Sequence, residues 1–283
     1  MPLTLEALAA PFPERTFQYD AERTRLYALG IGLGQDGAAA DLPYLIGPAP
    51  RVVPCMATVV AWDDSWIDRL GLDATRIVHG EQRITLHRPL PATATLRSSV
   101  RIVEAVDKGP GKGALLYVET RLQEEGRPEP LATLLSTVFA RGDGGFGGPA
   151  KGGPTPHAIP DRPWDHQRRW RVAPNQAHLY RLSGDHNPLH VDPDFARAAG
   201  FPAPILHGLC SYGMVLRAVI GEVLGDAPER VAHVAGRFTA PIFMDETLEA
   251  RIWVDGDTLS FRLVVVKRDV VAIDQGLVLL NPA

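Results

Sequence analysis

The chain has 283 residues, of which 45% are hydrophobic and 22% are charged, and its formal net charge is −4. This length allows about two domains with a sizeable core, so the fold requires neither a disulfide nor a metal for stability. The slightly acidic balance argues against a nucleic-acid-binding protein, which is usually basic.

The two cysteines, Cys55 and Cys210, lie in no metal-spaced cluster. We therefore expect no zinc site and no disulfide scaffold, and a reducing, cytoplasmic location. No apolar run approaches the roughly 18 residues that span a bilayer. The N-terminal segment lacks the basic and apolar regions of a signal peptide, so membrane association is not expected.

The first half of the chain predicts four β-strands, because runs rich in β-branched and aromatic residues alternate with Pro or Gly turns. These runs are residues 76–88, 93–107, 114–124 and 131–141. Residues 142–163 are dense in Gly and Pro and predict a linker, mobile at its Gly-rich start and stiffer near its prolines. The alternative is a long surface loop within one domain. The linker interpretation divides the chain into domains at 1–141 and 164–283.

The second half predicts helices followed by four more strands. Pro174, Asp192 and His207-Gly208 precede three helical segments, at residues 174–184, 192–200 and 208–224, the last of which is apolar nearly all round and so should be buried. The expected strands are residues 231–243, 247–255, 258–267 and 270–280. Antiparallel strands around a buried helix make an α+β arrangement.

The two halves show signs of internal duplication. Residues 88–96 (RPLPATATL) align without gaps on residues 240–248 (APIFMDETL), and both segments lie between the first and second predicted strands of their halves.

The densest functional candidate is the segment YRLSGDHNPLHVDPDF, which places Asp185, Asn187 and His190 within six positions of a loop. Asp and His together can move protons near neutral pH, and an amide can orient water or a carbonyl. The alternative is an Asx-turn and helix cap, with His190 as an ordinary core residue. The three side chains together, stiffened by Pro188, favour a catalytic function.

A second candidate is the segment PAPILHGLCSYG, in which His207 and Gly208 open the predicted buried helix. Free N–H groups at a helix start suit a developing oxyanion, and Gly208 would allow a carbonyl to approach the main chain. Two alternatives stay open: Gly208 only eases helix packing, and His207 only hydrogen-bonds the main chain at the helix start.

The motif at 180–190 resembles the signature of the (R)-specific enoyl-CoA hydratases, also called hydratase 2 or MaoC-like dehydratases. Residues 27–32, 78–91 and 107–114 resemble the first half, and residues 200–213 the second half, of the two-domain form found in peroxisomal multifunctional β-oxidation enzymes. The resemblance implies a double hotdog fold, with two antiparallel sheets each wrapped around a long buried helix. It also implies reversible hydration of trans-2-enoyl-CoA to (3R)-hydroxyacyl-CoA, without a cofactor or metal.

By the same resemblance, Asp185 and His190 are the catalytic pair, Asn187 supports them, and the Gly208 amide polarises the thioester carbonyl. Aligning Tyr27 with Tyr180 places Gly32 opposite Asp185, so the first half lacks the catalytic pair. We expect that half to contribute the acyl-tail pocket and part of the CoA surface.

Several further residues are candidates for substrate contact. We expect CoA to be held by some of a set of side chains that comprises Arg181, His207, Leu209, Arg237, Lys267 and Arg268. CoA rather than an acyl carrier protein, and a homodimer, follow from the resemblance alone. Acyl chain length cannot be predicted from these residues.

Rival functions are weaker. Gly32, Gly34 and Gly37 spell a dinucleotide fingerprint, but the preceding segment predicts a helix where a strand is required. Ser211 lacks the first glycine of a nucleophile elbow. An acyl-CoA thioesterase and a non-catalytic acyl-CoA-binding protein remain as alternatives, because a fold alone does not fix function.

Overall fold

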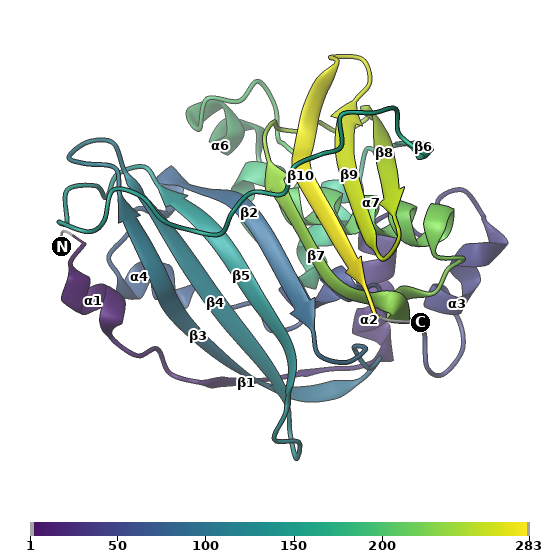
Figure 1. Ribbon diagram of the computed structural model, residues 1–283, viewed down its shortest axis with the longest axis horizontal. Coiled ribbons are helices and arrows are strands. Elements are labelled where there is room, and N and C mark those ends of the chain that lie inside the picture. The colour runs from purple at the N-terminus through teal and green to yellow at the C-terminus, as the bar shows by residue number, and fades with distance from the viewer. Residues whose placement is uncertain (1–2, 282–283) are drawn as a thin grey trace.

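A single antiparallel sheet of ten strands organises the computed structural model, which describes residues 3–281 (Figure 1). The strands are β1 (Arg15–Tyr19), β2 (Ile77–Leu86), β3 (Ala94–Asp107), β4 (Ala114–Glu124), β5 (Pro130–Ala140), β6 (His166–Arg171), β7 (Val231–Phe238), β8 (Thr247–Asp255), β9 (Thr258–Val265) and β10 (Val270–Leu280). Their order across the sheet is β1-β3-β4-β5-β2-β7-β10-β9-β8-β6. The two halves of the chain therefore meet where β2 pairs with β7.

The helices lie before the four expected strands of each half, although β1 precedes α2 and β6 precedes α5. The α-helices are α1 (Leu5–Ala9), α2 (Ala21–Gly30), α3 (Leu42–Leu45), α4 (Ser65–Arg69), α5 (Gln176–Tyr180), α6 (Pro193–Ala198) and α7 (Gly208–Val223). Short 3₁₀ helices are η1 (Ala39–Asp41), η2 (Pro54–Thr58), η3 (Ala74–Arg76), η4 (Arg181–Ser183), η5 (Pro188–His190) and η6 (Pro228–Arg230). The α+β class is confirmed.

Two details differ from the expectation of two sheets, each around a long helix. The sheets are joined, because residues 81–85 of β2 pair in register with residues 233–237 of β7. Only the second half has a long helix, α7, whose side chains are mostly buried. Within the described first half, the longest helix is α2, with ten residues.

Irregular chain covers the inner face of the first-half sheet in place of a long helix. Buried residues of η2 belong to the main core, together with side chains from α7 and from strands of both halves. A smaller core lies beside it, where Trp66 of α4 and Leu8 of α1 pack with Val100 and Leu116 of the sheet. The main core is therefore shared between the halves, which places α7 at their boundary.

The Gly- and Pro-rich segment 142–163 is irregular, and hydrogen bonds fasten it to the sheet. The Asp107 carboxylate accepts the main-chain N–H groups of Gly145 and Gly147, and Ser260 hydrogen-bonds His157. The Gly-rich start is thus tied to the end of β3. The division of the chain into two domains on either side of this segment stays a prediction.

Candidate functional site

The turn that carries Asp185, Asn187 and His190 begins at Gly184, directly after η4. Gly184 has a φ of 135°, in the left-handed region that favours glycine. Asp185 Oδ1 then accepts the Asn187 N–H at 3.1 Å, and Asn187 Oδ1 accepts the Leu189 N–H at 3.0 Å. The Asx-turn and cap considered from the sequence are therefore present. They fix the turn that presents the Asp185 side chain.

His190 is 8% exposed, and a main-chain carbonyl determines where its proton lies. Its Nδ1 is 2.9 Å from the carbonyl oxygen of Ile205. A carbonyl can only accept, so Nδ1 carries the hydrogen and Nε2 of the neutral ring keeps a lone pair. Ile205 is itself held by a β-bridge to Phe243. The sequence motif did not reveal Ile205, because it acts through its main chain.

His207 packs directly against His190. The ring centroids are 3.7 Å apart with an interplanar angle of 26°, and Tyr180 lies on His207 at 5.0 Å. His207 Nε2 is 3.3 Å from the main-chain oxygen of Asp185, so Nε2 donates. Burial lowers the pKa of His207 to about 2, which keeps the ring neutral. His207 thereby contacts both members of the predicted catalytic pair.

The pair lies in a low-dielectric environment that favours uncharged forms. Burial raises the pKa of Asp185, and the nearby His190 charge partly opposes this shift. Burial likewise lowers the pKa of His190, opposed by the Asp185 charge. Each of Asp185, His190 and His207 offers one potential ligand atom, and these atoms all lie within 4.8 Å of one another. This spacing suits a shared water, and it would also admit a cation.

The N-terminus of α7 begins immediately after His207. Gly208 and Leu209 are its first two residues, and N–H groups at such positions have no acceptor within the helix. A Cβ added at Gly208 would lie 3.3 Å from the Phe238 ring, so the packing role considered for this glycine has a clear basis. The predicted oxyanion donor therefore lies next to His207, which contacts the predicted catalytic pair.

The candidate substrate contacts fall into different surroundings. Leu209 is buried in the core, and Arg181, in the motif itself, has a buried Nε without a hydrogen-bond partner in the described structure. Arg237 pairs loosely with Glu81 at 3.8 Å, and Lys267 is exposed. Arg268, by contrast, is occupied: it donates to both carboxylate oxygens of Glu246 and to the Pro241 carbonyl.

Sequence reasoning also missed Arg23, a first-half residue that reaches the motif. Its Nη2 donates to the carbonyl of Ser183 at 3.0 Å, and Trp62 lies beside Gly184. No motif around Arg23 could have indicated this contact, because it depends on how α2 packs against α5 and η4.

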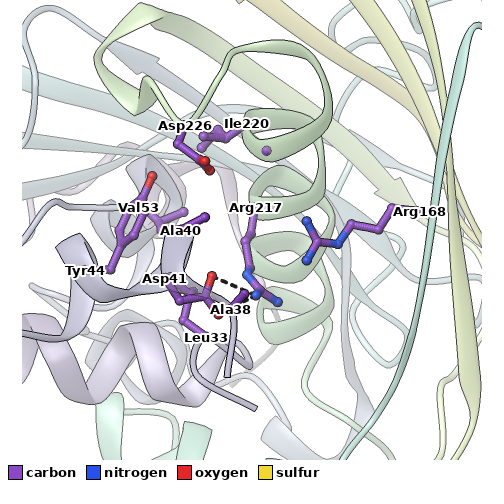
Figure 2. A pocket seen from close by; sticks show the side chains of 11 residues that line it. Leu33, Ala38, Ala40, Asp41, Tyr44, Val53, Arg168, Arg217, Ile220 and Asp226 are labelled. Carbon is purple, nitrogen blue, oxygen red and sulfur yellow. Dashed lines mark hydrogen bonds and ion pairs between the residues drawn. The ribbon is translucent and has the colours of Figure 1, made fainter. Parts of the chain in front are cut away.

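Two cavities lie away from this turn. One of about 230 Å³ lies over β3 and β4, and one of about 180 Å³ lies between α7, β6 and the first half. The second is lined by Arg168, Arg217 and Asp41 among others (Figure 2). Neither is lined by a residue of the 180–190 motif. Among residues 3–281, no helix is long and apolar enough to cross a membrane.

Comparison with known proteins gives two family matches that together cover most of the chain. Residues 17–142 match the MFE-2 hydratase 2 N-terminal domain, and residues 156–275 match the MaoC like domain. The chain is 37% identical to enoyl-CoA hydratase ChsH3 of Mycobacterium tuberculosis, over 95% of this chain and 96% of that protein. It is 38% identical to the peroxisomal enoyl-CoA hydratase 2 of Arabidopsis thaliana, over 93% and 90% of the two chains.

Solved structures confirm the hotdog fold. A MaoC-like dehydratase from Phytophthora capsici superposes with a TM-score of 0.84 at 30% identity, covering 99% of this chain and 100% of that chain. A double hotdog protein of Mycobacterium tuberculosis, at 16% identity and a TM-score of 0.56 over 94% of each chain, shares the fold alone. The motif, the fold and these matches agree, and the chain belongs to the family of MaoC-like enoyl-CoA hydratases that includes hydratase 2.

Proposed function

We propose that this protein reversibly hydrates trans-2-enoyl-CoA to (3R)-hydroxyacyl-CoA, with Asp185 and His190 as a catalytic pair. The observation that carries the proposal is the convergence of the Asp185 and His190 side chains beside the first N–H groups of α7. Membership in a family with named enoyl-CoA hydratases supports the reaction class. The roles of individual residues and the (3R) configuration belong to the proposal.

Proton transfer in the hydration direction follows from the tautomer of His190. Its free Nε2 takes a proton from water while the hydroxide adds to the β-carbon of the enoyl group. Asp185, whose raised pKa favours its protonated form, delivers a proton to the α-carbon. In each turnover His190 gains a proton and Asp185 loses one, so a proton passes from His190 to Asp185 before the next turnover. General acid–base catalysis of this kind contributes about 10²–10⁴ in rate.

The thioester oxygen becomes enolate-like as the hydroxide adds. The Gly208 N–H, at the positive end of the α7 dipole, stabilises that charge. One such donor contributes roughly 3–4 kcal/mol to the transition state. Because Asp185 and the water next to His190 face the alkene from the same side, the hydroxyl group and the hydrogen add to the same face.

The first half supplies substrate binding rather than catalysis in this proposal. Gly32 aligns with Asp185 and has no side chain, so the first half lacks a carboxylate at the position that corresponds to Asp185. We propose that it holds the acyl tail and part of the CoA, with no metal or organic cofactor, and that two copies form a homodimer. A cytoplasmic location is proposed likewise, although the Arabidopsis relative is peroxisomal.

The primary test measures enoyl-thioester absorbance with crotonyl-CoA and with trans-2-decenoyl-CoA, alongside a thiol reagent. Hydration removes the enoyl band without releasing thiol, and chiral analysis of the product should give the (3R) alcohol. Thiol release would instead make the protein a thioesterase, and binding without either change would make it a non-catalytic acyl-CoA-binding protein. Comparing the two substrates gives a first measure of pocket length.

Asp185→Asn tests the pair directly. It should lower turnover by about 10²–10⁴ while leaving the fold intact. Asp194→Asn is the matched control, because Asp194 is an exposed carboxylate of the neighbouring helix α6 and should have no effect on turnover. Wild-type turnover in Asp185→Asn would refute the assignment.

Chelation addresses the alternative that Asp185, His190 and His207 hold a cation. Prolonged dialysis against EDTA should leave the hydration rate unchanged, because the proposed steps use only these side chains and water. A loss of activity that Zn²⁺ or Mn²⁺ restores would instead assign a metal to this cluster.

A further inference from the structure

Arg23 lies in the half that lacks the catalytic pair, and we propose that it is a positioning residue for the Asp185 turn. The inference rests on the proposed function of Asp185. Arg23 does not contact the side chains of the proposed catalytic pair. It acts by hydrogen-bonding the main chain that carries Asp185. The first half would then contribute to catalysis as well as to substrate binding.

The position of Arg23 is set by the start of α2. Asp20 caps this helix by accepting the Arg23 N–H at 3.0 Å. From there the Arg23 side chain reaches the second half, where Nη2 lies 3.0 Å from the Ser183 carbonyl. The same Nη2 is 3.5 Å from the carbonyl of Val59 in the first half. Within the described structure, no carboxylate lies within salt-bridge distance of Arg23. Both acceptors of Arg23 Nη2 are main-chain oxygens.

Without the hydrogen bond from Arg23, the turn at Gly184 could take up other main-chain conformations. Gly184 follows Ser183 and has the wide conformational freedom of glycine. Arg23 holds the carbonyl before Gly184, and His207 holds the carbonyl of Asp185 after it. A Cβ at Gly184 would lie 3.2 Å from the Trp62 Cβ and 3.6 Å from Arg23 Nη2. The peptide group before Gly184 is therefore held from the first half of the chain, and the peptide group after Asp185 is held from the second half.

Loss of the hydrogen bond from Arg23 to the Ser183 carbonyl should displace the Asp185 carboxyl group without removing it. Arg23→Gln should lower kcat by about 10- to 100-fold, since small displacements of a catalytic group are costly, with little change in KM. It should also shift the pH profile of kcat/KM, because the mutual pKa effects of Asp185 and His190 depend on their separation. Arg23→Lys keeps a charge and one donor, and should recover part of kcat.

Arg25 provides a matched control on the same helix. Its side chain is 19% exposed, pairs with Glu22 at 2.6 Å and donates to the Gly47 carbonyl, on the side away from the motif. Arg25→Gln should lower stability to a similar degree as Arg23→Gln, but leave kcat and the pH profile unchanged. The comparison separates a positioning role from a general loss of stability.

Hydrogen exchange of a peptide covering residues 181–190 gives a readout that does not depend on activity. Exchange in this peptide should accelerate at least about tenfold in Arg23→Gln and not in Arg25→Gln. Unchanged exchange together with wild-type kcat and pH profile in Arg23→Gln would overturn the inference. If the wild-type protein does not hydrate enoyl-CoA, the proposed function fails, and the exchange experiment alone decides whether Arg23 fixes the turn.

Discussion

At the scale of single residues, the main chain decides what the motif can do. The sequence predicted Asp185 and His190 from their types and spacing, and the structure brings them together. The sequence alone could not predict which nitrogen of His190 carries the hydrogen, because this depends on the Ile205 carbonyl, 15 positions later in the chain. Nor could it predict that the Asn187 amide oxygen would accept the Leu189 N–H.

The environment of His190 predicts the acid limb of the pH–rate profile. Burial lowers the pKa of His190, so its imidazole stays neutral below the ordinary value of about 6.5. Because Nε2 must be unprotonated to take a proton from water, kcat/KM should fall only below that pH. The measurement is kcat/KM for crotonyl-CoA from about pH 5 to pH 8 at constant ionic strength.

Asp185→Asn sharpens this test through its residual activity. Asp185 acts as the protonated acid and so carries no charge in the reactive form, so replacing it by a neutral amide should leave the acid limb close to its wild-type pH. An acid limb above pH 6.5 in the wild-type protein, or a marked shift of that limb in the variant, would contradict the proposed roles of His190 and Asp185.

His207 should support the pair without exchanging protons. His207→Phe keeps a ring to stack on His190 but removes the donor to the Asp185 carbonyl, so turnover should fall about five- to tenfold. The pH profile should keep its acid limb, because the neutral His207 does not titrate in this range. His178→Phe, on the exposed side of α5, serves as the control. A fall of many orders of magnitude in His207→Phe would instead make His207 a catalytic residue.

At the scale of elements, the sequence predicts strands that are rich in apolar residues, and it misses edge strands that form only because a neighbouring strand pairs with them. All eight expected strands are present, and the Gly256-Asp257 turn joins β8 to β9 as a hairpin. β1 and β6 were not predicted. Both lie at the edges of the sheet, and the β6 sequence HQRRWR has almost no apolar face. Such segments become strands because β3 and β8 offer free hydrogen-bonding edges.

Helix α7 illustrates how an element is specified by its packing on every side. Gly213 lies where the first half crosses the helix: an added Cβ would be 2.7 Å from Ile31 Cγ2 and 2.7 Å from the Tyr27 hydroxyl. Gly213→Ala should therefore lower the free energy of unfolding by about 1–3 kcal/mol, through overpacking. Urea denaturation followed by circular dichroism measures the change.

Gly221 is the control on the same helix. Its nearest neighbour would be Arg168 Nη1 at 3.1 Å, the end of a flexible side chain that can move away. Gly221→Ala should be neutral or should stabilise by up to about 1 kcal/mol, because alanine is the better helix former. Equal losses in both variants would mean that close packing against the first half is not what requires Gly213.

At the scale of the whole molecule, the sequence showed two similar halves but not how they join. Nothing in the patterns of β2 or β7 marks them as partners, since both are ordinary alternating strands. Their pairing produces the continuous sheet, and α2 of the first half lies against the Asp185 turn of the second. Contacts between distant segments depend on complementary surfaces, which periodicity within a single sequence does not encode.

An ion pair between the two halves of the chain should contribute strongly to the stability of their interface. Arg217 of α7 donates through Nη2 to both oxygens of Asp41, at 2.8 and 2.6 Å, and the two side chains are only 13% and 8% exposed (Figure 2). Arg217→Met should lower the free energy of unfolding by about 3–5 kcal/mol, because the Asp41 carboxylate would stay buried with only the Gly34 N–H to donate to it within the described structure.

The double variant and a neighbouring arginine show whether burial of the unpaired charge is the cause. Adding Asp41→Asn to Arg217→Met removes both charges, so the double variant should be more stable than the two separate losses predict, by about 1–3 kcal/mol. Arg168 lines the same cavity but pairs only loosely, at 3.6 and 3.9 Å, so Arg168→Met should change stability by less than about 1 kcal/mol. Similar losses in Arg168→Met and Arg217→Met, or strict additivity in the double variant, would show that the pair does not fasten the halves. Their joint would then depend on the β2–β7 ladder and the shared apolar core alone.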